Sequence, residues 1–422
     1  MKKGAAMTSR RSFLKRSGTT LTGVFGLGAL AEAIEGRSSP YGRPRLKITA
    51  VRTAVVRAHG DQLHVRIETD QGLVGQGEGT DAVVGGPPLV ASFARFLVGQ
   101  DPLNVEALFE RIRTAGIFAG AQAGQYVAAL SAVEIALWDL AGKALNLPVY
   151  QLLGGKVRDR VRVYCDSQTN SPADPKALEK IAQIKELGFT AVKIDVDDRN
   201  DPARWDMVNW TASNAEIDTM LGKMAFMREA LDKRTDLAVD MHGRYDLTTG
   251  KRVAIEAEPF KLLFLEEPVP AENVDAMREV RESTKTPICC GENLFLRHGF
   301  REVLEKRAAD IIMPDLQKCG GLLEGRKIAD MAHTYYVPFA PHCVVSPIGT
   351  MASAHVCAAV PNFLVLEWHW IGRLPLWRTI VKEGEILERG FITVTDRPGL
   401  GVEMNEEAAR GAQAPGTTWF AG

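Results

Sequence analysis

Three acidic residues recur at an equal interval in the second half of the sequence. Glu266 follows Asp240 by 26 residues, and Glu292 follows Glu266 by the same interval. Each closes a short apolar run of the kind that forms a buried strand. Three neighbouring carboxylates repel one another and need a cation to stay ionised together, and Mg²⁺ prefers such hard oxygen ligands. We therefore predict that the three bind one Mg²⁺, against the alternative that each caps a helix or joins a salt bridge.

A second pair of residues has the types needed for proton transfer. His342 follows Asp315 by 27 residues, which is again the length of one strand–helix unit. A carboxylate bound to one imidazole nitrogen fixes the tautomer of the ring and raises the basicity of its other nitrogen. The pair predicts a general base, whereas a histidine in Ala-Pro-His without an acidic partner would more often be structural.

Another histidine, His242, stands two residues after Asp240 in the run Asp-Met-His-Gly-Arg. Residues i and i+2 of a strand point to the same side of the sheet. We therefore expect His242 to face the same cavity as the metal site. The competing interpretation is a structural histidine that supports a ligand, because histidine serves both roles readily.

These residues need a scaffold that brings strand ends together. From about residue 160 onward, short apolar runs alternate with helical segments, and polar residues recur where the runs end. Eight such runs over roughly 210 residues are typical of a TIM-type barrel, whose catalytic groups lie at the carboxyl ends of the strands. The predicted strands are Val161–Cys165, Ala191–Asp195, Ala238–Met241, Leu263–Glu266, Ile288–Gly291, Ile311–Met313, Phe339–Ala340 and Leu364–Leu366.

The remaining sequence predicts further segments around the barrel. Residues 46–159 begin with alternating strands and continue with helices, which indicates an α+β capping domain. The barrel then spans 160–383, and 384–422 is expected to return to the capping domain. A Ser/Pro/Gly-rich linker, 34–45, precedes the capping domain, and 1–33 has the character of a targeting segment.

That targeting segment contains a twin-arginine motif, Ser-Arg10-Arg11-Ser-Phe-Leu-Lys. A mildly apolar run of about ten residues comes next, too short to span a bilayer. Small residues at Ala29-Leu30-Ala31 or Ala31-Glu32-Ala33 offer a cleavage site. We expect export through the twin-arginine machinery to the periplasm. The alternatives are a disordered basic tail or, if cleavage fails, an N-terminal anchor.

Composition limits the partners. The chain has 422 residues, with 51 basic and 52 acidic side chains and a formal net charge of −1. This balance gives no electrostatic footprint for nucleic acid and argues against a membrane partner. The six cysteines form no CxxC pair, so we expect buried thiols rather than a disulfide framework. The expected partners are a small carboxylate substrate and further copies of the chain in a homo-oligomer.

Several longer motifs make the chain resemble the enolase superfamily, in its mandelate racemase-like branch, from Leu46 to Glu403. The motifs are Trp138-Asp-Leu-Ala-Gly-Lys, Leu152-Leu-Gly-Gly, Leu265-Glu-Glu-Pro, Gly291-Glu, Pro314-Asp, Gly320-Gly and Pro398-Gly-Leu-Gly. The resemblance implies a modified (β/α)7β barrel with an N-terminal α+β capping domain, and Mg²⁺-dependent abstraction of the proton α to a carboxylate. It assigns Asp240, Glu266 and Glu292 as metal ligands and Glu367 as the last-strand acid near the substrate carboxylate. His342 and Asp315 match the base dyad.

Two positions discriminate among reactions in this branch. The Asp-Met-His242 arrangement resembles galactonate and mannonate dehydratases, in which the histidine protonates the departing 3-hydroxyl. The second strand ends Lys193-Ile-Asp195, where racemases of the branch carry Lys-x-Lys. Asp195 could be a weak base, a partner for substrate hydroxyls or a buffer for Lys193, and Lys193 could contact the substrate carboxylate or Asp195.

The sequence thus predicts a hydro-lyase that converts a sugar acid, an aldonate or aldarate, into a 2-keto-3-deoxy acid. Arg244 and Trp368 are predicted to bind the substrate. Aromatic rings next to polar groups suit stacking on a sugar, and the alternative for Trp368 is packing in the core or in a lid. The alternatives are a racemase, epimerase or cycloisomerase on the same scaffold, or an exported binding protein that does not catalyse. A metal-dependent hydrolase is a weaker option.

Overall fold

The computed structural model describes residues 44–80, 85–167, 171, 173–198, 204, 206 and 208–420. The predicted signal segment, 1–33, and nearly all of the predicted linker lie outside the described residues. The chain from Arg45 to Gly422 clusters as one compact unit, and the helices and strands of the described residues all belong to it.

The first part of the unit is an antiparallel sheet covered by helices. Strands β1 (Ile48–Arg57), β2 (Asp61–Thr69) and β3 (Val74–Glu78) pair in that order. Alternation along β2 buries Leu63, Val65 and Ile67 in one cluster with apolar residues of the following helices. Those helices are α2 (Gly86–Leu97), α3 (Val105–Ala115), the 3-10 turn η2 (Ile117–Ala119), α4 (Gly124–Leu145) and the short α5 (Val149–Leu152).

The helix α4 packs directly on β3, and two glycines make this possible. A Cβ on Gly77 would lie 2.2 Å from the carbonyl oxygen of Ala132 and 2.5 Å from the nitrogen of Ala136. A Cβ on Gly75 would lie 2.1 Å from the oxygen of Ala136. The two backbones therefore meet without side chains between them, and this contact fixes the position of Glu78 at the end of β3.

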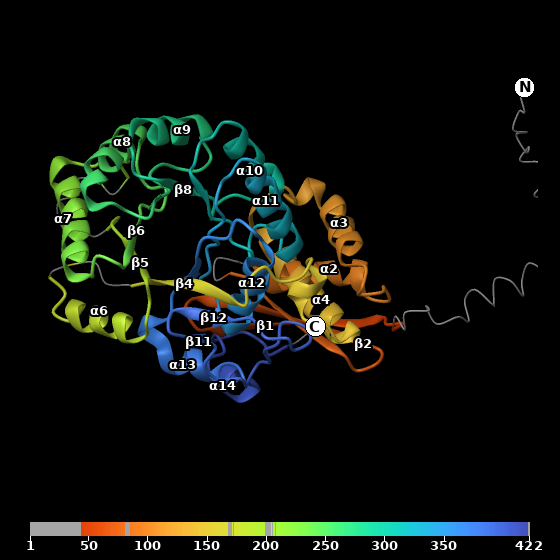
Figure 1. The fold of residues 1–422 in the computed structure, drawn as a ribbon. Helices are drawn as coiled ribbons and strands as arrows, with labels where there is room; N and C mark the ends of the chain where they lie inside the picture. Colours follow the sequence, from red (N-terminus) through yellow and green to blue (C-terminus); the bar gives the residue numbers. More distant parts are fainter. Residues whose placement is uncertain are drawn as a thin grey trace, which may run out of the picture. The chain divides into compact units, whose positions relative to one another are not determined.

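The second part is a barrel of parallel strands, each followed by a helix on the outside (Figure 1). The first three units are β4 (Arg160–Asp166) with α6 (Ala177–Glu186), β5 (Ala191–Asp195) with α7 (Asn214–Ala230), and β6 (Asp236–Asp240) with α8 (Leu247–Glu256) and η3 (Glu258–Phe260). The next three are β7 (Leu265–Glu266) with α9 (Val274–Ser283), β8 (Ile288–Cys290) with α10 (Leu296–Glu305), and β9 (Ile311–Ile312) with α11 (Leu322–Thr334). The seventh strand is reduced to bridges at Phe339 and is followed by α12 (Pro347–Ala359), and β10 (Leu366–Trp368) is the eighth.

The ring of strands closes through short pairings. Ile312 bridges Phe339, Phe339 bridges Phe363, and β10 pairs with β4 through Leu366 and Val163. The predicted (β/α)7β barrel with an α+β capping domain is thus confirmed. The predicted eighth strand, Leu364–Leu366, is wrong in its bounds, because the paired residues begin at Leu366 and continue past Glu367.

Strand residues alternate between the inside of the barrel and the helical layer. The inward residues form a small cluster of their own, whereas the outward ones join the large core beneath the helices. The inward members are Tyr164, Ala191, Ala238, Phe264, Cys289, Ile311, Met313, Ala340 and Val365. Lys193 and Asp195 have the same parity as Ala191, and Asp240 has the parity of Ala238. The charged residues therefore continue the inward rows at the mouth of the barrel.

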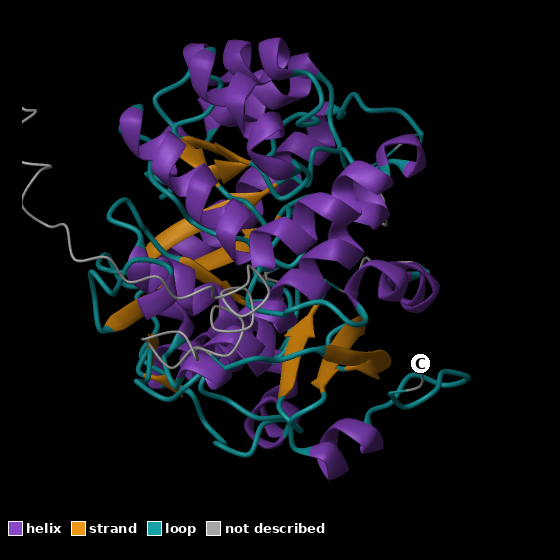
Figure 2. Ribbon diagram, turned by 90° about the vertical axis from the view of Figure 1, so that its right-hand side faces the viewer, coloured by secondary structure: helices purple, strands orange, loops and turns teal. Residues whose placement is uncertain are grey.

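After β10 come η4 (Ile371–Arg373), α13 (Leu374–Thr379), β11 (Leu387–Glu388), β12 (Phe391–Thr393) and α14 (Glu406–Gly411). This segment contacts both parts of the unit. β12 pairs antiparallel with β4, and Ala414 donates from its backbone nitrogen to the oxygen of Val55 in β1 at 2.9 Å. Leu400 donates to Asp139 of α4 at 2.9 Å. The strands of the two sheets form separate groups in Figure 2.

All six cysteines are buried and free, as the sequence predicted. Among the described residues, no helix has the length and apolar character needed to cross a membrane.

The contact between β3 and α4 generates a stability prediction. Gly77→Ala must push α4 away from the sheet, and we expect it to lower the free energy of unfolding by about 1 to 3 kcal/mol. Gly222 is the control, because it is a glycine inside α7 with nothing within 4 Å of an added Cβ. Gly222→Ala should raise stability by up to about 1 kcal/mol. Urea unfolding of the two variants measures the difference, and equal stabilities would contradict the close contact.

Candidate active site

The mouth of the barrel collects acidic side chains from neighbouring strands. Asp195, Asp240 and Glu266 are the last residues of β5, β6 and β7, and the register pairs Asp195 with Asp240 and Asp240 with Glu266. All three lie in one row because parallel strands of equal register end together. Asp240 and Glu266 are almost completely buried. The structure thus brings the first two predicted metal ligands side by side.

Glu292 reaches the same place by a different route from the predicted one. β8 ends at Cys290, so Glu292 lies two residues beyond the strand rather than at its end. Gly291 between them has a φ of 138°, and a Cβ there would lie 2.7 Å from the Phe300 ring. This glycine lets the chain turn inward. Asp240, Glu266 and Glu292 each offer an oxygen within 4.8 Å of the others.

Lys193 lies among these carboxylates, with its side chain buried. Its Nζ is 2.8 Å from Glu266 Oε2, 2.8 Å from Glu367 Oε1 and 3.1 Å from Asp240 Oδ2. Burial by itself lowers the pKa of Lys193, but Glu266 and Glu367 raise it well above its usual value. Lys193 is therefore a fixed positive charge here. Its contacts are with the acids, so the predicted contact with substrate stays a prediction.

The donor set fits a divalent cation. Burial, together with the neighbouring charges of Asp240 and Glu292, raises the pKa of Glu266 well above its usual value. A cation beside such a carboxylate would favour its ionised form. All three members of the trio are carboxylates, which matches the preference of Mg²⁺ for hard oxygen ligands.

The predicted base dyad is formed. His342 Nδ1 is 2.9 Å from Asp315 Oδ2, which leaves Nε2 to face the mouth of the barrel. That nitrogen is 3.1 Å from Glu292 Oε2 and 3.5 Å from Glu367 Oε2. Burial lowers the pKa of His342, but Glu367, Glu292 and Asp315 outweigh it and raise the pKa to about 10.

Glu367, in the middle of β10, lies between the base and the lysine. Its Oε2 accepts from the backbone nitrogen of Cys343 at 2.9 Å, and its Oε1 pairs with Lys193. Burial alone would raise the pKa of Glu367, but Lys193, His342 and His369 lower it far below its usual range. Glu367 is therefore an ionised acceptor in this arrangement.

His242 lies beside Asp240, although not for the predicted reason. β6 ends at Asp240, and His242 has a φ of 51°, so strand alternation does not orient its side chain. A tight turn does, because the backbone nitrogen of His242 donates to Asp240 Oδ1 at 2.7 Å. Its Nε2 is 3.6 Å from Asp240 Oδ2.

The other nitrogen of this ring has an acidic partner. His242 Nδ1 is 2.7 Å from Asp197 Oδ1, and Arg244 pairs with the second oxygen of Asp197. Burial lowers the pKa of His242, but Asp197, Asp240 and Asp195 raise it to about 10. His242 is thus held protonated. The guanidinium of Arg244 is engaged with Asp197, and its predicted substrate contact stays a prediction.

Asp195 has a perturbed environment of its own. Burial and the charges of Asp166 and Asp240 raise its pKa to about 7, against the opposing effects of His242 and Lys193. It joins Asp240 and His242 in a second group of ligand-type atoms. A carboxyl group that titrates near neutrality can exchange a proton or a hydrogen bond with substrate, so more than one of its predicted roles stays open.

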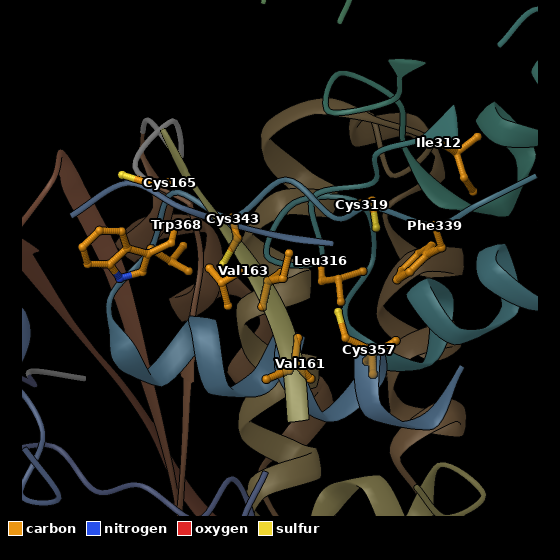
Figure 3. Close-up of a cluster of buried hydrophobic side chains, with 14 of the residues drawn as sticks. Val161, Val163, Cys165, Ile312, Leu316, Cys319, Phe339, Cys343, Cys357 and Trp368 are labelled. Carbon is orange, nitrogen blue, oxygen red and sulfur yellow. The ribbon is translucent and has the colours of Figure 1, made fainter. Parts of the chain in front are cut away.

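The prediction that Trp368 binds substrate is wrong. Its side chain is completely buried and packs against Phe189 and Trp377, with ring centroids 5.1 and 5.6 Å away. Figure 3 shows it in the buried cluster with Val163 and Cys165. The reason is alternation along β10: Glu367 points into the barrel, so the next residue must point outward.

Sequence reasoning missed several members of the site. Asp166, the last residue of β4, is 3.1 Å from His369 Nε2 and 3.9 Å from Lys193 Nζ. His369 Nδ1 is in turn 3.2 Å from Nε2 of His59, in the turn between β1 and β2. Asp166 could have been found, because it extends a predicted strand by one residue with inward parity. His59 and Asp197 follow no such pattern.

A capped (β/α)7β barrel with three clustered carboxylates and an Asp–His dyad defines an enzyme architecture suited to proton abstraction beside a bound carboxylate. The chain matches the mandelate racemase/muconate lactonizing enzyme N-terminal domain over residues 43–154 and the enolase C-terminal domain-like family over 176–408. It therefore belongs to the enolase superfamily, in the mandelate racemase-like branch.

Individual relatives agree with this assignment. A D-xylonate dehydratase of Haloferax volcanii is 41% identical over 92% of this chain and 94% of its own length. A D-galactonate dehydratase of Variovorax paradoxus is 33% identical over 86% and 93%. The crystal structure of a mandelate racemase/muconate lactonizing enzyme-like protein from Rubrobacter xylanophilus superposes with a TM-score of 0.84 at 45% identity, covering 89% of this chain and 99% of that one.

The buried Lys193 generates a prediction. Lys193→Met removes the ammonium and leaves its carboxylate partners without it, so we expect a loss of about 3 kcal/mol or more in unfolding free energy in chelator. Millimolar Mg²⁺ should restore part of that loss. Lys223→Met is the control, because Lys223 is a buried lysine whose Nζ donates to the carbonyl oxygen of Val196 at 3.4 Å. If Mg²⁺ stabilised Lys193→Met no more than the control, Lys193 would not share its partners with a cation site.

Proposed function

We propose that this chain is a Mg²⁺-dependent dehydratase of a sugar acid. It removes the proton from C2 and the hydroxyl from C3, and the enol product tautomerises to a 2-keto-3-deoxy acid. The observation that carries the proposal is the pair of histidines that flank the carboxylate trio. His342 contacts Glu292 at one end, and His242 contacts Asp240 at the other. The relatives named D-xylonate and D-galactonate dehydratase support the same reaction class.

Asp240, Glu266 and Glu292 would hold the cation. A Mg²⁺ ion held there would supply positive charge for the substrate carboxylate and for the negative charge that grows on it as the C2 proton leaves. Within the protein, Lys193 offsets part of the charge of the same carboxylates. Together, the cation and Lys193 would offset the three carboxylate charges, so that the substrate carboxylate does not meet an uncompensated negative site.

His342 is the base in this proposal. Asp315 orients the ring through Nδ1, so that Nε2 takes up the C2 proton. Glu292 and Glu367 hold the ring protonated, whereas a base must first be neutral. Neutralisation of Glu292 by a bound cation would remove one of these charges and lower the pKa of His342 toward that of a base.

His242 is the acid. Asp197 and Asp240 keep its ring protonated, and Arg244 holds Asp197 in place. A protonated imidazole beside the metal site can deliver its proton to the C3 hydroxyl as the C–O bond breaks, and water leaves. Acid and base are thus separate residues, as an elimination requires.

A cavity of about 430 Å³ opens beside His242. None of the trio or the dyad lines it, so in this proposal it would receive only the far end of a polyhydroxy chain. Besides His242 and several apolar or backbone groups, its lining includes Gln122, Glu267, Glu272, Asn293 and His298. Side chains with hydrogen-bond donors and acceptors are what hydroxyl groups require. This supports a sugar acid over an apolar carboxylate.

A racemase or epimerase needs a competent base on each face of C2. The residue that occupies the second lysine position is Asp195, and Lys193 is held protonated by its acidic neighbours. Both features favour dehydration. A binding protein without activity would have no need for two differently oriented histidine–carboxylate pairs.

Substitutions of the two histidines should separate removal of the C2 proton from loss of the C3 hydroxyl. With a sugar acid that is a substrate, His342→Asn should abolish both exchange of the C2 proton with deuterium oxide and formation of the 2-keto product. His242→Asn should keep the exchange but slow dehydration by about a hundredfold or more, because general acid catalysis contributes factors of this size. NMR and a 2-keto acid assay measure the two steps. His333→Asn, at an exposed histidine in α11, is the control. Unchanged dehydration in His242→Asn would contradict the assignment of the acid.

We also propose that residues 1–33 direct export of the folded enzyme by the twin-arginine route, since such an enzyme can acquire its fold and buried thiols before export. Replacing Arg10 and Arg11 together by lysine should retain the protein in the cytoplasm, because the machinery reads the arginine pair. Cell fractionation measures this against Lys2→Arg, which changes a lysine outside the motif. Export that survives the double substitution would contradict the proposal.

A further inference from the structure

Two buried glutamates of the capping domain direct their carboxylates toward the starts of two helices of the barrel. Glu78 is the last residue of β3, and Glu134 lies in the middle of α4. They are 0% and 2% exposed. Neither takes part in the proposed dehydration, and each accepts hydrogen bonds from the start of a barrel helix.

Glu78 accepts from the start of α12. Its Oε1 receives the backbone N–H of Ser346 at 2.7 Å, and its Oε2 receives the hydroxyl of Ser346 at 2.5 Å and the N–H of Gly349 at 2.8 Å. Ser346 is the N-cap of that helix. The negative charge therefore meets the positive end of the helix dipole, where it is stabilising. A Cβ on Gly349 would lie 3.0 Å from Glu78 Oε2, so the glycine permits the approach.

This helix has its N-cap four residues after His342, and side chains hold the backbone of every residue in between. The contacts are Glu367 with Cys343 N at 2.9 Å, Gln62 with Val344 O at 3.2 Å, Trp370 with Val345 O at 2.7 Å, and Glu78 with Ser346 N at 2.7 Å. Two of these four side chains, Gln62 and Glu78, come from the capping domain. The segment that carries the base is thus clamped between the cap and the end of the barrel.

Glu134 accepts hydrogen bonds from the start of α11, the helix that follows Asp315. Its two oxygens accept from the backbone nitrogens of Leu322 and Leu323, at 2.8 and 3.1 Å. The N-cap of α11 is Gly321, which has no side chain to satisfy these donors. A Cβ on Gly321 would lie 2.1 Å from Glu134 Oε2, so this carboxylate occupies the space that a side chain would need.

The two clamped segments meet at the dyad. Asp315 bonds His342 at 2.9 Å, and its other oxygen accepts from the N–H of Gln317 at 2.8 Å. The amide of Gln317 then donates to the carbonyl oxygen of Gly349 in α12 at 2.9 Å. The Asp315–His342 distance therefore depends on the placement of both helices, each of which is held from the cap.

We propose that Glu78 and Glu134 are positioning residues, through which the capping domain sets the geometry of the His342–Asp315 base dyad. This inference deepens the proposed function and rests on it for the role of the dyad. These two residues of the capping domain would then position the catalytic base without touching the substrate. A misplacement of about 1 Å in such a dyad can cost two orders of magnitude in rate.

The test uses isosteric variants of the full-length protein. Glu78→Gln keeps the volume but turns one oxygen into an amide nitrogen, so that a donor must face the N–H groups of Ser346 or Gly349. Glu134→Gln does the same at α11. Asp139→Asn is the control. Asp139 is a completely buried acid of α4 that accepts from Gln76 N and Leu400 N, both at 2.9 Å, and pairs with Lys143; none of these partners belongs to α11, α12 or the dyad.

Measurements are made at pH 8.5, because burial raises the pKa of both Glu78 and Glu134 to about 7. The readouts are the C2 exchange rate, kcat and KM, the melting temperature, Mg²⁺ affinity by calorimetry, and backbone amide exchange of a peptide covering 343–349. We expect Glu78→Gln and Glu134→Gln to lower exchange and kcat about tenfold or more with KM and Mg²⁺ affinity unchanged. The backbone amides of 343–349 should exchange faster in Glu78→Gln than in Asp139→Asn. The comparison is made under conditions in which both variants have lost the same amount of melting temperature, so that global destabilisation does not account for the difference.

The outcomes separate the two proposals. If the wild-type protein turns over sugar acids but both glutamine variants keep its rates, or if Asp139→Asn loses as much rate, positioning by the cap is overturned. If the wild-type protein has no such activity, the proposed function fails. Faster amide exchange of 343–349 in Glu78→Gln then still supports positioning, and unchanged exchange overturns it. Should the charge variants not fold, Gln62→Met removes one neutral hydrogen bond to Val344 and should lower kcat several-fold, with unchanged kcat overturning the inference.

Discussion

The structure of the site depends on one electrostatic constraint: the barrel concentrates carboxylates around a single buried ammonium. Nζ of Lys193 lies within 3.1 Å of Asp240, Glu266 and Glu367, and Glu292 joins the same cluster from beyond β8. One positive charge does not balance this set of carboxylates, so a further cation at the mouth of the barrel would offset the remaining negative charge. The same excess of negative charge extends to both histidines and raises the pKa of each ring to about 10.

The barrel and the capping domain contribute differently to the site. The barrel provides the rows of inward side chains, and parallel strands that end at one level bring residues far apart in sequence into contact. The capping domain buries its own apolar core against α4, and the same helix and the adjacent β3 hold the starts of α11 and α12. In the proposed mechanism, the acid His242 follows the metal ligand Asp240 by two residues at the end of β6. The base dyad comes from later in the barrel, and the starts of the helices that follow Asp315 and His342 are held from the capping domain.

Much of this arrangement follows from local pattern. The equal interval between strand ends identified Asp240 and Glu266, and the repeat length of one strand–helix unit identified the dyad. Alternation, applied strictly, would also have excluded Trp368, since it follows the inward Glu367. The turns after the strands were harder to predict from the sequence. His242 is oriented by a left-handed φ of its own backbone, and Glu292 is oriented by Gly291, which follows β8. The contact between Glu78 and Ser346 joins residues 268 positions apart, and no local signal predicts such a pair.

The central claim, Mg²⁺-dependent dehydration of a sugar acid, is tested most directly by a screen of aldonic and aldaric acids, D-xylonate and D-galactonate included. The purified protein is assayed in the presence of Mg²⁺ and again after chelation. We predict formation of a 2-keto-3-deoxy acid from at least one of these acids, with deuterium exchange at C2, and loss of both in chelator. Exchange or inversion at C2 without loss of water, or turnover that persists after chelation, would contradict the claim.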